Sequence, residues 1–117
     1  NAHSVHPNHP EYADPVNRPV TNGGIVIKYS AAQKYATNAF SAAYFKKLCK
    51  DHDIPTQAFT NHSDNPGGST LGNISNTVIA MPTVDIGLPQ LAMHSSYETA
   101  GVKDTAYLVD AVTKFYE

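Results

Sequence analysis

The chain alternates between short β-branched or apolar runs and longer blocks with helical periodicity. Residues 25–29 form a β-branched run after the turn signal Asn22-Gly23-Gly24, which predicts a buried strand. Residues 56–60 predict a second strand, and residues 83–86 predict a third. The pattern therefore predicts three strands, each followed by a helical block.

The most regular helical block lies between the first two predicted strands. Thr37 or Asn38 can cap its start, and Pro55 closes the segment. Lysines crowd its last turns, where the helix macrodipole favours cations. Apolar side chains recur at helical spacing and define its predicted buried face, namely Phe40, Ala43, Tyr44, Phe45, Leu48 and Cys49.

Two further helices are predicted nearer the carboxyl end. The turn at residues 64–72 leads into a short helix to about Ala80, with a buried side formed by Ile74, Val78 and Ile79. Asp104 is predicted to cap the last helix. One apolar stripe along that helix is predicted to be core, and it consists of Tyr107, Leu108, Ala111, Val112 and Phe115.

The predicted order is strand, helix, strand, helix, strand, helix. In this alternation, right-handed crossovers join parallel strands, so we expect an α/β fold with a βαβαβα order and mainly parallel strands. This core is expected to span residues 24–117. Residues 1–23 contain four prolines, which exclude a regular helix and predict an extended loop or arm.

Composition and charge exclude several classes of function. With 117 residues, 41% of them hydrophobic, the chain is one domain or part of one. A net charge of -2 gives no electrostatic argument for nucleic acid or an anionic membrane as partner. The single cysteine, Cys49, predicts a reducing, cytoplasmic compartment and is expected to be a core residue. No signal peptide or membrane span is recognisable, and the start at Asn1 without methionine suggests a piece of something longer.

His94 is the first candidate for chemistry. It closes the stretch GLPQLAMHS at 87–95, which leaves the third predicted strand and is otherwise apolar. The imidazole is either a core histidine bound by a backbone carbonyl or a metal ligand at a strand end, where α/β proteins build sites. Asp85 either orients this ring through a hydrogen bond or faces solvent. Ser95 and Glu98 have capping-box spacing, which predicts a helix that starts directly after His94.

Lys28 ends the first predicted strand and is the second candidate. A lysine there is either an edge residue that faces solvent or a cation that binds an anion. The glycine turn at 64–72 precedes a helix whose first amides can bind an anion, although no GxxxxGK[ST] nucleotide loop is present. The residues alone predict a site formed by His94, Lys28 and this turn.

His3, His6 and His9 recur at every third position of the arm. In a polyproline II conformation this spacing places neighbouring members about 9 Å apart. Ligands of one zinc lie within ~2.1 Å of the ion, so a straight arm cannot bind one ion through neighbouring members. The triplet is therefore weak evidence for a metal site.

Five stretches together resemble the M18 aminopeptidases, the aspartyl aminopeptidase family. They are NAHSVHPN (1–8), GIVIK (24–28), QKYAT (33–37), DNPGGSTLG (64–72) and PQLAMHS (89–95), and they occur in the family's order. The resemblance covers nearly the whole chain, whereas the chain resembles only the carboxy-terminal part of such an enzyme.

The resemblance implies a zinc-exopeptidase-like three-layer domain in which two zinc ions activate a water that attacks the first peptide bond. It implies that His94 is a terminal zinc ligand and that Lys28 receives an acidic side chain of the peptide substrate. His3 and Tyr35 are implied as further pocket residues. The remaining ligands and the general base would lie upstream of Asn1, so the resemblance implies that this chain alone is inactive, and that the full enzyme is a homo-oligomer.

Two alternatives stay open at this point. Some members of the family prefer neutral N-terminal residues. The second alternative is that the chain is a catalytically silent α/β domain that serves binding or assembly. The DNA upstream of Asn1 distinguishes the peptidase from the silent domain, because a peptidase requires an aspartate, paired glutamates and a histidine there.

Overall fold

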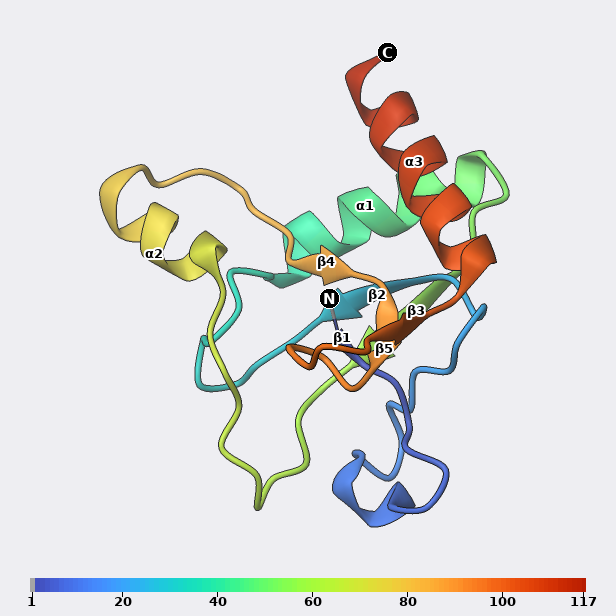
Figure 1. Cartoon of the computed structure of the whole chain (residues 1–117). Coiled ribbons are helices and arrows are strands. Elements are labelled where there is room, and N and C mark those ends of the chain that lie inside the picture. Colours follow the sequence, from blue (N-terminus) through green and yellow to red (C-terminus); the bar gives the residue numbers. More distant parts are fainter. Residues whose placement is uncertain (1) are drawn as a thin grey trace.

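Two three-stranded sheets form the framework in the computed structural model, which describes residues 2–117 (Figure 1). The first sheet has the order β3 (Thr56–Phe59), β2 (Ile25–Lys28) and β4 (Ile86–Gly87). The second has the order β1 (Ala2–His3), β5 (Pro89–Leu91) and β6 (Thr99–Ala100). Asn1, the first residue of the predicted arm, lies outside the described residues.

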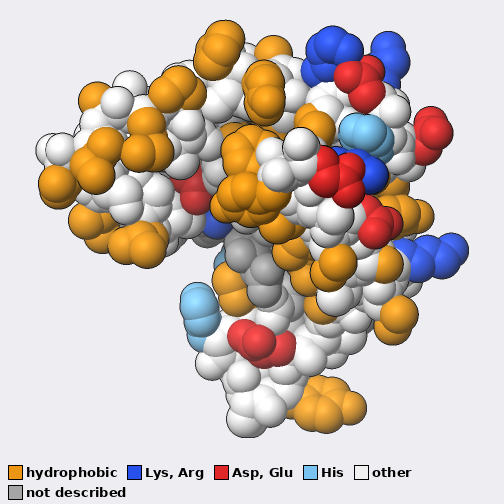
Figure 2. All heavy atoms as spheres, turned by 90° about the horizontal axis from the view of Figure 1, so that it is seen from above, with side chains coloured by type: hydrophobic (Ala, Val, Ile, Leu, Met, Phe, Trp, Pro, Cys, Tyr) orange, Lys and Arg blue, Asp and Glu red, His pale blue; other side chains and the backbone are white. Residues whose placement is uncertain are grey.

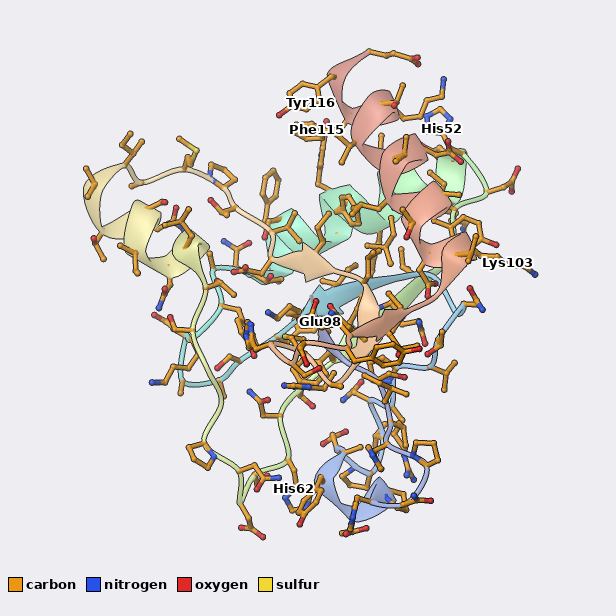
Figure 3. The ribbon with its side chains drawn as sticks, in the orientation of Figure 1. His52, His62, Glu98, Lys103, Phe115 and Tyr116 are labelled. Carbon is orange, nitrogen blue, oxygen red and sulfur yellow. The ribbon has the colours of Figure 1, made fainter. Side chains whose placement is uncertain are left out.

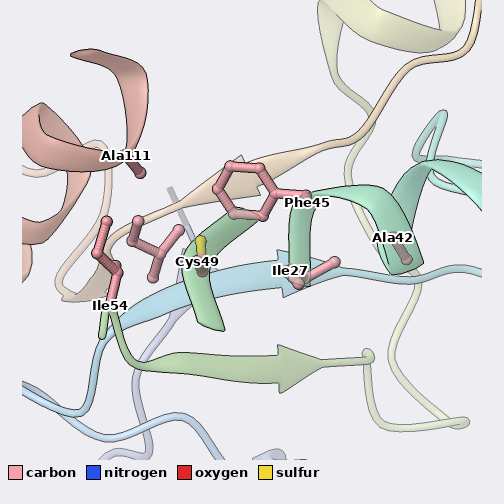
Figure 4. Close-up of a cluster of buried hydrophobic side chains, with 7 residues drawn as sticks. Ile27, Ala42, Phe45, Cys49, Ile54 and Ala111 are labelled. Atoms are coloured by element: carbon pink, nitrogen blue, oxygen red, sulfur yellow. The ribbon is translucent and has the colours of Figure 1, made fainter. Parts of the chain in front are cut away.

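β2 is the centre of the fold because both of its faces are covered. Ile25 and Ile27 point to one face, where they pack with Ala42, Phe45, Cys49, Ile54 and Ala111 (Figure 4). Val26 belongs to a second buried cluster with Ala2, Tyr35 and Phe59. Since successive strand residues point to opposite faces, Lys28 shares the face of Val26 rather than that of the helices.

Burial also raises the pKa of the Cys49 thiol to about 11, and the predicted core role of this cysteine is confirmed.

α1 (Ala39–Asp51) follows the prediction at its start but not in its buried face. Asn38 and Ser41 form a reciprocal capping box, so Asn38 is the cap rather than Thr37. Phe45 and Cys49 are buried as predicted, whereas Phe40 is 68% exposed and Tyr44 is also exposed. The helix turns by about 100° per residue, so a neighbouring stripe that contains Ala42 faces β2 instead.

α2 (Leu71–Val78) is present, but its predicted buried side is wrong. Val78 is 81% exposed, and Ile74 and Ile79 are exposed as well. The helix stands away from both sheets in Figure 1, and hydrophobic side chains gather over the same lobe in Figure 2. Neither sheet therefore covers this apolar face within residues 2–117.

α3 (Val102–Tyr116) is capped at Gly101, so the prediction that Asp104 caps it is wrong. The Asp104 carboxylate is fully buried and instead accepts hydrogen bonds from the backbone N–H groups of Asn22, at 2.6 Å, and Gly24, at 2.9 Å. This interaction ties the first turn of α3 to the loop that leads into β2. In the predicted core stripe, only Ala111 is buried, while Tyr107 and Leu108 are partly buried. Val112 and Phe115 are exposed, and Figure 3 shows Phe115 and Tyr116 at the outer end of the helix.

The α/β class is confirmed, but the predicted strand order is not. β2 pairs in parallel with β3, and β1 pairs in parallel with β5, whereas the β2–β4 and β5–β6 pairs are antiparallel. α1 lies against the sheet and returns the chain for a parallel crossover. α2 does not pack on the sheet, and the extended return from it lets β4 run antiparallel to β2.

The arm also differs from a plain loop. It contributes β1 to the second sheet and contains a short 3₁₀ helix, η1 (Pro10–Tyr12). Within residues 2–117, none of the helices has the length and apolar character needed to cross a membrane.

Candidate functional site

Lys28 is buried at the end of β2, with 6% of its surface exposed. The alternative in which it faces solvent is therefore wrong for this chain. Its Nζ lies 4.1 Å from the centroid of the Tyr35 ring, a cation–π contact. Burial lowers the pKa of Lys28, and the negative charge of Asp85 acts in the opposite direction.

Tyr35 covers the Lys28 ammonium from the loop between β2 and α1. The ring is buried and packs at 6.4 Å from the Phe59 ring, centroid to centroid. Its hydroxyl oxygen accepts a hydrogen bond from the side-chain amide of Asn61 at 3.3 Å. Phe59 of β3 and Asn61, which lies two residues further along the chain, therefore hold the Tyr35 ring in place over Lys28.

His3 lies in β1 and is held in register with Gln90 of β5. Burial lowers the pKa of His3, and the positive charges of Lys28 and His94 lower it further. Lys28 and His94 therefore lie close enough to His3 for their charges to act on its ring. The structure thus brings together side chains from the first, second and fifth strand regions of the chain.

His94 follows β5 in a tight turn rather than preceding a helix. Its φ is 71°, and that of Ala92 is 54°. The backbone N–H of His94 donates to the Glu98 carboxylate, and the N–H of Tyr97 donates to the Ser95 hydroxyl. The capping box was wrong because residues 99–100 pair with β5 as β6, so the chain stays in the sheet until α3 begins. Figure 3 shows Glu98 beside this sheet, well away from the end of α3.

The His94 side chain is exposed, so the alternative of a buried core histidine is wrong. Its role as a metal ligand stays a prediction. Within residues 2–117, no group of three or more histidine, cysteine, aspartate or glutamate residues could hold a metal ion. The donor set of this chain therefore fits one position of a zinc centre and not a whole centre.

His6 and His9 lie closer together than the spacing of about 9 Å expected for a straight arm, but within residues 2–117 the arm histidines form no metal-binding group. The rings of His6 and His9 lie 5.3 Å apart, centroid to centroid, and His9 stacks on Tyr12 at 5.4 Å. His9 Nδ1 pairs with the Glu11 carboxylate at 3.0 Å, and His6 Nδ1 accepts the Asn8 N–H. These local contacts account for the positions of the His6 and His9 rings without a metal ion.

A cavity of about 400 Å³ lies between the arm and the glycine turn. His3, His6 and Tyr12 line one side, while Gly67 and Gly68 line the other. The predicted glycine turn is therefore near His3, but neither Lys28 nor His94 is among the residues that line this cavity. His3 lines this cavity, as do Phe59 and Asn61, which contact the Tyr35 ring over Lys28.

Asp85 contributes to this neighbourhood in a way that the sequence analysis missed. Its carboxylate accepts the Ala36 N–H at 2.6 Å instead of orienting His94. Its backbone N–H donates to the Thr37 hydroxyl at 2.8 Å, and its carbonyl accepts the Lys28 N–H at 2.9 Å. The pairing of β2 with β4 creates this contact, and no local motif signals it.

Comparison with known proteins gives the family. A family model described as "Aminopeptidase I zinc metalloprotease (M18)" matches residues 1–116. "Probable M18 family aminopeptidase 2" of Clostridium acetobutylicum is 50% identical over 115 residues, covering 98% of this chain and 27% of that protein. The protein of the same name from Pseudomonas paraeruginosa is 47% identical over 116 residues, covering 99% of this chain and 27% of the relative.

Solved structures match over nearly the same residues. A chain in the cryo-EM structure of the Ape4 and Nbr1 complex superposes with a TM-score of 0.95 at 39% identity, over 98% of this chain and 22% of that one. The S. cerevisiae mApe1 dodecamer gives a TM-score of 0.84 at 27% identity, over 97% of this chain and 24% of that one. The chain spans about a quarter of the length of the curated relatives it matches. Because the family model and the relatives align over almost the whole chain, this chain belongs to the M18 family of zinc metalloproteases.

Proposed function

We propose that this chain is part of a zinc aminopeptidase that removes the N-terminal residue, preferably Asp or Glu, from peptides. The observation that carries the acidic preference is the state of Lys28. The residue is 6% exposed and its ammonium lies over the Tyr35 ring, and no carboxylate within residues 2–117 forms a salt bridge with it. A buried charge without an ionic partner is costly, so a carboxylate that enters from the substrate is strongly favoured.

His94 is proposed to supply one zinc ligand. The exposed imidazole follows a turn with positive φ, and the contact of Glu98 with its backbone holds that turn. Zinc in a hydrolase acts as a Lewis acid, and two ions with further ligands from outside this chain are part of the proposal. In this proposal the described residues supply the His94 imidazole on one side and the Lys28 ammonium on the other, and the charges of both act on His3.

His3 and Tyr35 are proposed to line the substrate pocket. Tyr35 forms the apolar cover over Lys28, so the aliphatic part of an acidic side chain would contact the ring while its carboxylate meets the ammonium. The lowered pKa of His3 keeps its ring neutral near pH 7, where it can accept or donate a hydrogen bond. A neutral ring also avoids adding positive charge beside Lys28.

We further propose that the whole enzyme assembles into a homo-oligomer. The support is the S. cerevisiae mApe1 dodecamer, which is 27% identical over the matched region.

The function is tested on the full-length enzyme that contains this chain. Peptides that differ only in the N-terminal residue, Asp, Glu, Leu or Ala, are compared by kcat/KM before and after zinc is removed by a chelator and restored. We expect cleavage of Asp- and Glu-peptides to exceed that of Leu- and Ala-peptides, and we expect zinc to restore the lost activity. An enzyme with equal rates on all four peptides would contradict the acidic preference, and full activity without zinc would contradict the metal chemistry.

A further inference from the structure

We propose that Asp85 is a positioning residue that holds the Tyr35 segment against Lys28 and thereby determines the preference for acidic N-terminal residues. This inference rests on the proposed function of Lys28. Asp85 directly precedes β4, and in the proposed function it contacts neither the zinc ions nor the substrate.

The hydrogen bonds of Asp85 join the end of β2 to the loop residues that follow Tyr35. Its carbonyl oxygen accepts the Lys28 N–H at 2.9 Å, which holds the end of β2. Its carboxylate accepts the Ala36 N–H at 2.6 Å, and its N–H donates to the Thr37 hydroxyl at 2.8 Å. Asp85 thus binds β2, which carries Lys28. It also binds Ala36 and Thr37, which directly follow Tyr35, the aromatic cover of the Lys28 ammonium.

The carboxylate has little freedom to take another position. A Cβ atom added to Gly72, in the first turn of α2, would lie 3.1 Å from Asp85 Oδ2 and 3.3 Å from the Ala36 Cβ. The Thr83 hydroxyl donates to the Asn76 side-chain oxygen at 3.1 Å, which ties the residues before Asp85 to the same helix. The start of α2 therefore lies close against the Asp85 carboxylate, although the apolar face of this helix stays exposed.

The negative charge of Asp85 also acts on Lys28, although the two side chains form no salt bridge. No salt bridge within 4.0 Å joins the two side chains among the described residues, since the carboxylate is directed to Ala36. The negative charge still favours the protonated lysine against the opposing effect of burial. The arrangement leaves the ammonium without a salt bridge among the described residues, so it is available for a carboxylate of the substrate.

The experiment compares Asp85→Ala and Asp85→Asn in the full-length enzyme, with Asp110→Asn, an exposed acid on α3, as control. We expect Asp85→Ala to raise KM for Asp-peptides about tenfold, equivalent to about 1.4 kcal/mol, while kcat and the cleavage of Leu-peptides change less than about twofold. Asp85→Asn keeps an oxygen that accepts the Ala36 N–H, so it should lose less. Asp110→Asn should match the wild type.

A second variant covers the case in which Asp85→Ala does not fold. Thr37→Val removes the hydroxyl that accepts the Asp85 N–H and should shift KM for Asp-peptides in the same direction by a smaller factor. Equal losses on Asp- and Leu-peptides in the folded variants would show a purely structural role and overturn the inference. Lys28→Gln on the same panel separates the two proposals. If Lys28→Gln abolishes the acidic preference and the Asp85 and Thr37 variants leave it intact, only the inference on Asp85 fails. If the wild type shows no acidic preference, both proposals fail.

Discussion

Replacement of Lys28 by glutamine tests the central electrostatic argument. Lys28 is a buried residue, and in the proposal its ammonium lies at ~4 Å from a bound substrate carboxylate, where two unit charges attract by about 4 kcal/mol at an effective dielectric constant near 20. Desolvation of the substrate carboxylate removes part of that energy. A net preference on the order of 2–3 kcal/mol remains, which corresponds to roughly a hundredfold in kcat/KM.

Glutamine keeps much of the lysine's length and a hydrogen-bond donor but lacks the charge. In the full-length enzyme, Lys28→Gln should therefore lower kcat/KM for Asp- and Glu-peptides strongly while Leu- and Ala-peptides are cleaved at nearly the normal rate. The assay is initial-rate cleavage of peptides that differ only at the N-terminal residue. Lys103→Gln, on the exposed start of α3 in Figure 3, controls for the loss of one positive charge.

The pH dependence gives an independent check. Burial lowers the pKa of Lys28, partly offset by Asp85, so the lysine loses its proton below its ordinary value of 10.5. Lysine binds the carboxylate only when protonated. The ratio of Asp- to Leu-peptide cleavage should therefore be highest below the lowered pKa and fall as pH rises through it, and Lys28→Gln should show no such fall. If Lys28→Gln reduces both peptide classes equally, Lys28 is structural or generally catalytic, and the assigned specificity is wrong.

Three further predictions concern the metal and the backbone. His94→Ala in the full-length enzyme should remove zinc and most activity with little change in Tm; two zinc ions per subunit and near-normal turnover in the variant would show that His94 is not a ligand. The chain of residues 1–117 should bind zinc more weakly than ~1 µM by isothermal titration, because its described residues include no set of three ligands; tighter binding would contradict that account. Gly24→Ala should lower the free energy of unfolding by about 1–3 kcal/mol, because Gly24 has a φ of 109° and an added Cβ would overlap the Pro55 carbonyl. An unchanged Tm would refute this prediction.

The sequence by itself determined the elements that depend on local patterns. The β-branched run at 25–27 has no alternative to burial, and it forms the central strand. Asn38 and Ser41 can satisfy each other's backbone N–H groups within one turn, so the start of α1 is encoded locally. The five motifs also carried the M18 resemblance, which the family model confirms over residues 1–116.

The tertiary structure alone decided which faces of these elements are buried. Helical periodicity gives neighbouring stripes that differ by one residue, and the position of β2 selected the stripe with Ala42 over the one with Phe40. The apolar face of α2 is exposed because neither sheet reaches it, which no local pattern reveals. Pairing with β5 likewise prevented a helix directly after Ser95, because residues 99–100 form β6 in the second sheet.

The same division applies to the candidate site. Lys28 and His94 were recognisable from their positions at the ends of apolar runs. The bonds of Asp104 to the loop before β2 and those of Asp85 join residues that are far apart in sequence. The cover of Tyr35 over Lys28 depends on the irregular loop between β2 and α1. Such contacts form only when the sheets and helices pack, because each partner is an ordinary polar or aromatic residue in its own segment. The sequence thus determined which groups are available, and the packing around β2 decided which of them meet.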